Sequence, residues 1–215
     1  MRIDHVVLAV RDLDGSAARL AAETGLAAIP GGRHPGWGTA NRIMPLGADY
    51  VELLSVVDAG VGVGTRLGRT LMALTQDGRD RWFSVCLADG DIDHTAARLG
   101  LAVEAGSRTR PDGVEVRWRG AGIEDPSRPN WLPFFIDWAT PPGEHPGRSR
   151  AEHAGRPTGI ASVAIDGAPA VMRDWLGGAD IPLEVTDHGE PYGVRSVTVA
   201  VDGGDAIVIE GAPPR

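Results

Sequence analysis

The chain of 215 residues carries a formal net charge of −8 at pH 7 and 42% hydrophobic residues, a composition typical of a globular protein with a sizeable core. The acidic balance argues against general nucleic-acid binding, which needs a basic face, and no apolar stretch approaches the roughly 18 residues of a membrane span. A single cysteine, Cys86, excludes an intramolecular disulfide, so we expect a cytoplasmic protein that acts without nucleic acid or a membrane as its partner.

The first predicted unit covers residues 1–57. An apolar strand over 3–10 precedes a helix that Asp12 or Asp14 can cap and that Gly25 ends. A short strand, a Pro-Gly-Gly turn and the two strands of a hairpin follow at 26–29, 30–32, 39–46 and 49–57. The predicted order of elements is therefore β-α-β-β-β.

The second unit, residues 79–140, repeats the first after a glycine-rich connection at 60–78 that contains a further helix. The segment IDHVVLAVRDLDGSAARL at 3–20 returns as WFSVCLADGDIDHTAARL at 82–99. The elements expected in this unit are a strand, a helix and three more strands, at 82–87, 91–99, 101–105, 114–119 and 132–138. Duplicated strand–helix units indicate a repeat architecture, and the ungapped match predicts that the two units pair in one domain over 1–140.

Residues 141–157 are rich in proline and lack apolar periodicity, so they are expected to be a linker. The last segment, 158–215, is predicted as a third, shortened βαβββ unit. Its strand, helix and three further strands are expected at 159–166, 169–176, 182–186, 194–201 and 206–210. The fold class expected for the chain is α+β.

Several segments resemble the vicinal oxygen chelate superfamily (glyoxalase, bleomycin resistance, dioxygenase), and its glyoxalase-like domain subgroup in particular. They are IDHVVLAVRDLD, GGRHPGWGTANRIMPLG and DYVELLSV in unit one, and GRTLMALTQDGRDRWFSVCL and RPNWLPFFIDW around unit two. The resemblance implies tandem βαβββ modules that form a cup-shaped mixed sheet around a divalent metal, with ligands on the first and last strands of each unit. Members include isomerases, epimerases, dioxygenases and drug-sequestering proteins, so the resemblance leaves the activity open.

Two residues of unit one stand where the superfamily holds its metal. His5 lies inside the first strand, on the face of Ile3 and Val7 by strand alternation, and is either a core histidine or a metal ligand. Glu52 interrupts the apolar run YVELL, so it either faces solvent or needs a metal, an arginine or a hydrogen-bond network. The resemblance makes His5 and Glu52 half of a site for zinc, iron, manganese or nickel.

The other half of such a site is weaker in this sequence. The register of the repeat puts Ser84 where unit one has His5, and it puts Asp137 near the position of Glu52. The third unit offers Glu210 at the glutamate position, which makes it a further candidate ligand. Serine is a poor ligand for a divalent transition metal, so a metal-free cup stays an open alternative.

A glycine-rich loop in unit one, GGRHPGWGTAN, combines backbone freedom with polar and aromatic side chains. Arg33 can hold a carboxylate or a phosphate, and His34 can act as a base near neutral pH. Trp37 and Asn41 complete the expected substrate contacts of this loop. The alternative is a hairpin whose glycines supply turn dihedrals and whose tryptophan covers the core.

Three residues of unit two have the same two interpretations. Trp131 either contacts substrate or packs on the core. Arg117 and Arg119 alternate with apolar residues and share one face of a strand, which is either a basic strip inside the barrel or a solvated outer face.

Two functions follow from these candidates. The first is a metal-assisted enzyme of isomerase, lyase or dioxygenase type that acts on a small oxygenated substrate. Its candidate catalytic residues are Glu52, Asp137 and His34, and its candidate metal ligands are His5, Glu52 and Glu210. The second is a metal-free protein of the same fold that binds a small molecule or sequesters a drug. The resemblance also leaves open whether the cup is completed within one chain or across a homodimer.

Overall fold

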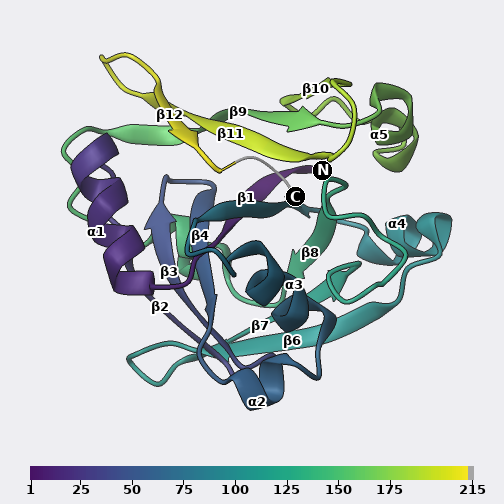
Figure 1. Ribbon diagram of the computed structural model, residues 1–215, viewed down its shortest axis with the longest axis horizontal. Helices are drawn as coiled ribbons and strands as arrows, with labels where there is room; N and C mark the ends of the chain where they lie inside the picture. The colour runs from purple at the N-terminus through teal and green to yellow at the C-terminus, as the bar shows by residue number, and fades with distance from the viewer. Residues whose placement is uncertain (213–215) are drawn as a thin grey trace.

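The computed structural model describes residues 1–212 and shows a closed eight-stranded barrel with a second, four-stranded sheet across its outside (Figure 1). Unit one supplies β1 (Arg2–Ala9), α1 (Leu13–Thr24), β2 (Ile29–His34), β3 (Thr39–Pro45) and β4 (Tyr50–Val56). Unit two supplies β5 (Arg81–Ala88), α4 (Ile92–Leu99), β6 (Val103–Thr109), β7 (Glu115–Ala121) and β8 (Phe134–Trp138). The short helices α2 (Ala59–Gly62) and α3 (Arg66–Leu74) connect the two units.

Units one and two form one closed barrel. The barrel order is β1-β4-β3-β2-β6-β7-β8-β5, and within each unit the first strand runs parallel to the last. The units meet along the antiparallel pair of β1 and β5 and at a narrow seam where Arg33 of β2 pairs with Thr109 of β6. One chain therefore completes the cup.

The repeat extends to the helix caps. The Asp12 carboxylate accepts hydrogen bonds from backbone N–H groups at the start of α1, and Asp91, its counterpart in the repeat, does the same for α4. Gly25 and Gly100 end the two helices with φ angles of 72° and 69°, a conformation that glycine adopts without strain. The local sequence therefore sets where both helices begin and end.

The predicted Pro-Gly-Gly turn at 30–32 is wrong, because β2 runs through these residues. The two glycines are needed because neighbouring atoms fill the space beside them, not because the chain turns there. A Cβ atom on Gly31 would overlap the amide of Asn41, and one on Gly32 would lie 2.5 Å from the carbonyl oxygen of Thr109. The chain turns later, where Gly38 has a φ of 66°.

The segment at 141–157 forms two 3-10 turns, Pro142–Glu144 and Pro146–Arg148, and packs against unit one. The backbone N–H of Gly47 donates to the carbonyl of Gly147 at 2.8 Å, and the His153 ring bridges Ala27 N and Pro45 O. These contacts fix the segment on the barrel, although its composition resembles that of a linker.

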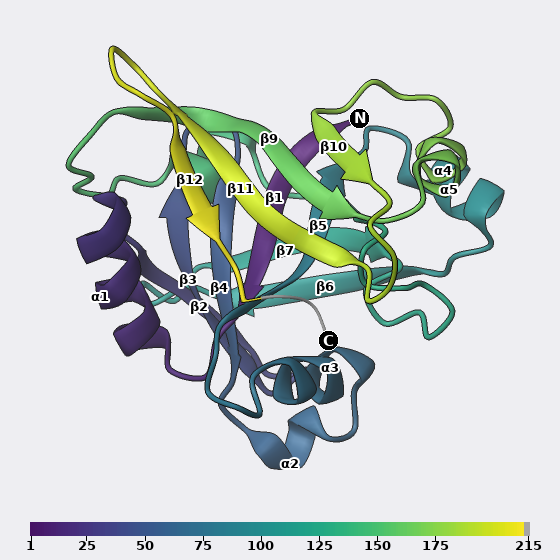
Figure 2. The ribbon, with the colours of Figure 1, turned by 45° about the horizontal axis from the view of Figure 1, so that its top comes forward.

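The third unit has the predicted order of elements but a different strand arrangement. It comprises β9 (Pro157–Asp166), α5 (Pro169–Trp175), β10 (Leu183–Thr186), β11 (Gly193–Val201) and β12 (Ile207–Glu210). Its sheet order is β10-β9-β11-β12, so its first strand lies between the second and the third and does not pair with the last. The sheet lies across β1 and β5 (Figure 2), where Val163 and Val197 join Val6 in one hydrophobic core. The last three residues of the predicted unit lie outside the described residues.

Within residues 1–212, no helix is long and apolar enough to cross a membrane.

Candidate functional site

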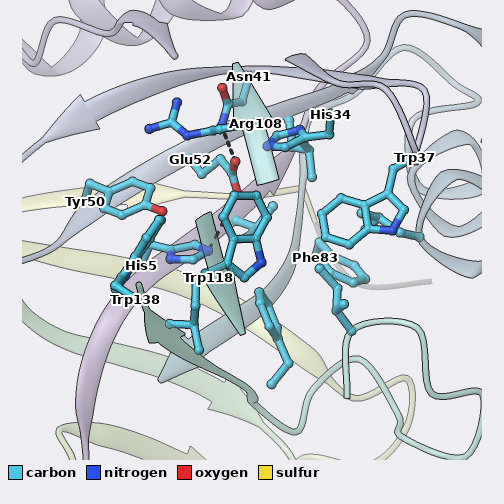
Figure 3. A pocket seen from close by; sticks show the side chains of 16 residues that line it. His5, His34, Trp37, Asn41, Tyr50, Glu52, Phe83, Arg108, Trp118 and Trp138 are labelled. Carbon is cyan, nitrogen blue, oxygen red and sulfur yellow. Dashed lines mark hydrogen bonds and ion pairs between the residues drawn. The ribbon is translucent and has the colours of Figure 1, made fainter. Parts of the chain in front are cut away.

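The interior of the barrel contains a small, partly open cavity (Figure 3). Both units line it. Its polar and aromatic lining consists of His5, His34, Trp37, Asn41, Tyr50, Glu52, Phe83, Arg108, Trp118, Phe134 and Trp138. The cavity therefore joins titratable groups with an aromatic wall.

A β-bulge aims His5 into this cavity. The pairing of β1 with β5 skips Asp4 between Ile3 and His5, which rotates the side chains that precede the bulge relative to those that follow. His5 and Val7 consequently line the cavity, whereas Ile3 belongs to the core beneath the second sheet. The predicted common face of His5 and Val7 is confirmed, and the prediction that Ile3 shares it is wrong.

The bulged residue, Asp4, is fully buried and orients the His5 ring. Its carboxylate accepts hydrogen bonds from His5 Nδ1 at 2.8 Å, Trp138 Nε1 at 2.9 Å and His145 Nε2 at 3.0 Å. Burial alone would raise the pKa of Asp4, but the hydrogen bonds from His145 and His5 hold it well below its usual range. An ionised Asp4 keeps the proton of His5 on Nδ1 and leaves the lone pair on Nε2.

The lone pair of His5 faces a second acceptor. Glu52, on β4, is only 7% exposed, and its Oε2 lies 3.6 Å from His5 Nε2. Its Oε1 accepts a short hydrogen bond from Nδ2 of Asn41. Glu52 therefore lies inside the cup, not on a solvent-facing surface, and the predicted need for a hydrogen-bond partner is met by Asn41. Glu52 Oε2 and His5 Nε2 are close enough to share a proton that a substrate delivers between them.

His34 also lines the cavity, next to Trp37 and Trp118. Its Nδ1 lies 3.0 Å from the hydroxyl oxygen of Thr39. Burial lowers the pKa of His34 to about 4, while the charges of Glu52 and Arg108 act on it in opposite directions. His34 is therefore a neutral imidazole at neutral pH and a weaker base than the sequence suggested.

Arg108 is the residue that sequence reasoning missed. It comes from β6 of unit two, is only 5% exposed and lines the cavity beside the residues of unit one. Its Nη1 is buried without a hydrogen-bond partner among the described residues. Burial lowers the pKa of Arg108, and the charge of Glu52 acts in the opposite direction. No local pattern marks it, because the strand segment that carries it, VEAGSRT, is mostly exposed.

A helix fixed by a carboxylate closes part of the cavity. Glu124 accepts hydrogen bonds from the backbone N–H groups of Arg66 and Leu67 at 2.8 and 3.0 Å, and the Arg66 guanidinium donates to the carbonyl of Ile123. These contacts hold the start of α3 against the loop after β7. Leu67 and Ile123 thereby complete the apolar part of the lining.

Unit two places no metal ligand opposite His5 and Glu52. Strand pairing matches Val7 with Glu52 in unit one and Cys86 with Phe134 in unit two, so Phe134 is the counterpart of Glu52. Ser84, the counterpart of His5, donates to the carbonyl of Leu132 and accepts from Nη1 of Arg128. At these positions unit two therefore has the phenyl ring of Phe134 and the Ser84 hydroxyl, which is hydrogen-bonded to Arg128.

The donor set does not fit the metal site of the superfamily. Two atoms bound to one metal at about 2.1 Å lie roughly 3.4 Å apart, so the 3.6 Å between His5 and Glu52 suits two ligands, whereas sites of this type use three or four. Within residues 1–212, the one group of three convergent ligand-type side chains is Asp4, His5 and Cys86. Asp4 already accepts three hydrogen bonds, and burial raises the pKa of the Cys86 thiol well above its usual value.

Four residues predicted for the site lie outside the cavity. Arg33 lies on β2 but does not line the cavity. Trp131 packs against Tyr192 of the third unit, which matches its interpretation as core packing. Asp137 lines a separate depression with Arg2 and Asp89, and Glu210 lies on β12 beside Arg11 and Arg19. The structure thus brings together His5, His34, Trp37, Asn41 and Glu52, all from unit one.

The comparisons with known proteins agree with this architecture. The family model described as Glyoxalase-like domain matches residues 3–177. A hypothetical protein from Staphylococcus aureus is similar over 97% of this chain and 85% of its own, with 18% identity and a TM-score of 0.65, which shows the shared fold. No curated protein matches the chain significantly.

Two solved epimerases are more distant. Methylmalonyl-CoA epimerase from Mycobacterium tuberculosis is 16% identical, covering 65% of this chain and 89% of its own, with a TM-score of 0.46. The Streptomyces coelicolor enzyme, in complex with 2-nitronate-propionyl-CoA, is 20% identical, covering 65% of this chain and 99% of its own, with a TM-score of 0.46.

Proposed function

This chain belongs to the glyoxalase-like domain family, and from that premise we propose that it is a metal-independent enzyme that moves a proton on a small oxygenated substrate in the cup. The observation that carries the proposal is the buried pair of Glu52 Oε2 and His5 Nε2, 3.6 Å apart and both able to accept a proton. Isomerase and lyase reactions that pass through an enolate begin with such a transfer.

The residues of unit one can perform the transfer without help from a metal. The Glu52 carboxylate takes a proton from a carbon next to a carbonyl group, and the electron pair of the broken C–H bond moves onto the carbonyl oxygen as an enolate. The proton then returns to the same or a neighbouring atom through Glu52 or His5. Asp4 holds the His5 ring in the tautomer that this role needs.

The developing enolate needs a neutral donor that does not itself lose its proton. Tyr50 stacks on His5 with the ring centroids 4.6 Å apart, and burial raises the pKa of its phenol well above the usual value. Tyr50 therefore stays protonated and can donate a hydrogen bond to the oxygen where negative charge forms.

A metal-free binding protein is the second candidate, and the aromatic lining favours it. Trp37, Trp118 and Trp138 form a continuous wall, with centroid distances of 6.2 and 5.7 Å between successive rings. Aromatic surfaces of this kind bind flat ligands whether or not chemistry follows. The two candidates differ in whether Glu52 moves a proton.

Deuterium exchange separates these candidates. The protein is incubated in D₂O with neutral methyl ketones and with 2-oxo carboxylates, and α-proton exchange is followed by NMR. We expect exchange with the wild-type protein, a loss of about 100-fold or more in Glu52→Gln, and no change in the control Glu115→Gln on the exposed face of β7. Exchange no faster than in Glu52→Gln for every compound would contradict the proposed enzyme and leave a binding cup.

The cellular location and the oligomeric state are the remaining parts of the proposal. Cys86 is buried and unpaired, which suits the reducing conditions of the cytoplasm, where we place the protein. Because one chain closes the barrel, the proposed chemistry needs no residue from a second copy. A homodimer stays a prediction.

A further inference from the structure

We propose that the ligand of the cup is a planar carboxylate whose two oxygens pair with the guanidinium of Arg108. This inference rests on the proposed function in that both concern the same cavity, and it adds the chemical class of the substrate. It also gives unit two a role, because Arg108 is the charged side chain that this unit contributes to the lining.

The guanidinium of Arg108 lacks a partner. The residue is only 5% exposed, and within residues 1–212 no hydrogen bond or ion pair to its side chain occurs. Arg128 is also buried and also has one nitrogen without a partner, Nη2, but its other nitrogens are held by the carbonyls of Gly122 and Leu132. A buried donor without a partner has lost its hydration and gained no hydrogen bond, so Arg108 is poised for an acceptor that the protein itself does not supply.

Glu52 does not take that place. It is the carboxylate that lines the cavity, yet it forms no ion pair with Arg108 within 4.0 Å, and its Oε1 accepts from Asn41 instead. The charge of Glu52 still acts on Arg108. The guanidinium therefore lies near the acid–base pair while its donors remain available to a ligand.

The strand seam explains how Arg108 reaches the cavity. β2 lies between β3, which carries Asn41, and β6, which carries Arg108. A Cβ atom built on Gly32 would lie 3.6 Å from Cδ of Arg108 and closer still to the backbone of Thr109. The two glycines of β2 thus let side chains from both neighbours pass across it, and Figure 3 shows Arg108 beside Asn41 above Glu52.

The chemistry of the surrounding groups selects the ligand. A guanidinium offers a planar fork of donors that matches the two oxygens of a carboxylate. The rest of the wall is aromatic: Trp37, Phe83, Trp118 and Phe134 present flat surfaces to the same space. A flat, conjugated carbon skeleton that ends in a carboxylate satisfies both features.

The test compares benzoate with benzamide, which have the same shape and differ in charge. Binding is measured by tryptophan fluorescence and confirmed by calorimetry, since three tryptophans line the cavity. We expect wild-type protein to bind benzoate about 10-fold or more tightly than benzamide. Equal affinities, or binding of neither compound, would overturn the proposal without any variant.

Variants of Arg108 then test whether its guanidinium is the group that favours the anion. Arg108→Gln is expected to weaken benzoate binding about 10-fold or more and to leave benzamide binding within about two-fold. Arg108→Lys keeps the charge but loses the fork, so it should recover only part of the affinity. The control Arg117→Gln removes an exposed arginine of β7 and should change neither affinity. Equal losses in Arg108→Gln and Arg117→Gln would contradict the assignment.

The two proposals fail in different ways. Charge-selective binding that depends on Arg108, without deuterium exchange in any compound, would leave the carboxylate site and remove the enzyme. Exchange in neutral ketones that depends on Glu52 and is unchanged in Arg108→Gln, with no charge-selective binding, would leave the enzyme and remove the carboxylate site.

Discussion

The two units of the barrel share a strand order but contribute different chemistry to one cavity. Unit one supplies every acid–base group of the lining, His5, His34 and Glu52, whereas unit two supplies Arg108 and aromatic rings. The difference begins at equivalent positions: the bulge in β1 places Asp4, and the bulge in β5 skips Phe83, which stands at the same point of the repeat. Duplication thus preserved the backbone irregularity while its side chain changed from a carboxylate to a phenyl ring.

The difference between the two units shows that acid–base chemistry can take place only on the unit-one side of the cavity. A carboxylate at the first bulge orients a histidine, and a phenyl ring at the second enlarges an apolar wall. A symmetric metal site would need ligands from both units, and the counterparts of His5 and Glu52 are Ser84 and Phe134. The following predictions test how far the two units have diverged.

The largest effect is expected at the bulge of unit one. Asp4→Ala removes the acceptor for His5, His145 and Trp138 and leaves their donors buried, so the free energy of unfolding should fall by about 3–5 kcal/mol. The matched change in unit two, Phe83→Leu, should cost only about 1 kcal/mol, because it alters packing and the contact of the ring with the Arg128 guanidinium but leaves no hydrogen-bonding group unpaired. Urea denaturation of both variants measures this, and equal losses would show that the two bulges play the same structural role.

The second effect is a pH dependence that comes from two groups of unit one. Burial raises the pKa of Asp49 to about 6 and lowers that of His34 to about 4. The folded state binds the Asp49 proton more tightly than the unfolded state, so this group lowers stability as pH rises from about 4 to about 6. His34 binds its proton less tightly when folded, so it raises stability as pH rises from about 4 to about 6.5.

In the wild type these two contributions oppose each other. Asp49→Asn should therefore make stability rise with pH across this window, and His34→Gln should make it fall, each by at most about 2–3 kcal/mol and less for the partly exposed Asp49. Denaturation between pH 4 and pH 7 measures the slopes. Parallel profiles for the two variants would contradict the opposite burial effects.

The third effect concerns the glycines of β2, where the units meet. Gly31→Ala places a Cβ atom on the amide of Asn41, and we expect a loss of about 1–2 kcal/mol together with weaker benzoate binding. A Cβ atom on Gly36 would meet no other atom within 4 Å, so Gly36→Ala is the matched control and should change neither quantity. Equal tolerance of both changes would mean that Asn41 can move without consequence.

The smallest effect is expected on the outside of unit two. Arg117 and Arg119 are exposed and pair with Glu115 and Asp93, so they form a solvated face and not a basic strip inside the barrel. Arg117→Gln should leave the melting temperature unchanged because exposed ion pairs contribute little. A clear drop would contradict the assignment of Arg117 to a solvated face.

The architecture could be predicted well because its signals are local or repeated. Apolar strands, the caps at Asp12 and Gly25 and the duplicated segment each follow from short-range patterns. The turn at 30–32 failed because glycines signal turns and close packing alike, and only the neighbouring strands decide between them.

Only part of the candidate site could be predicted from the sequence. His5, Glu52, His34, Trp37 and Asn41 lie on strands or loops whose patterns are irregular for their position, such as a carboxylate within an apolar run. Arg108 gave no such signal, since it lies on a polar strand. Asp4 also interrupts an apolar run, but its role could not be predicted because it needs a bulge to reach its partners. The sequence aligns Asp137 with Glu52 because each is a carboxylate in an apolar strand, whereas strand pairing gives that place to Phe134.

The most direct test of the account is the metal content of the cup. Protein treated with chelator and then titrated with zinc, manganese, nickel and iron by calorimetry should show no stoichiometric site that His5→Ala or Glu52→Ala removes. Near-stoichiometric binding to the wild-type protein, lost in both variants, would contradict the claim that unit two has replaced the metal-binding half of the cup with Arg108 and aromatic side chains.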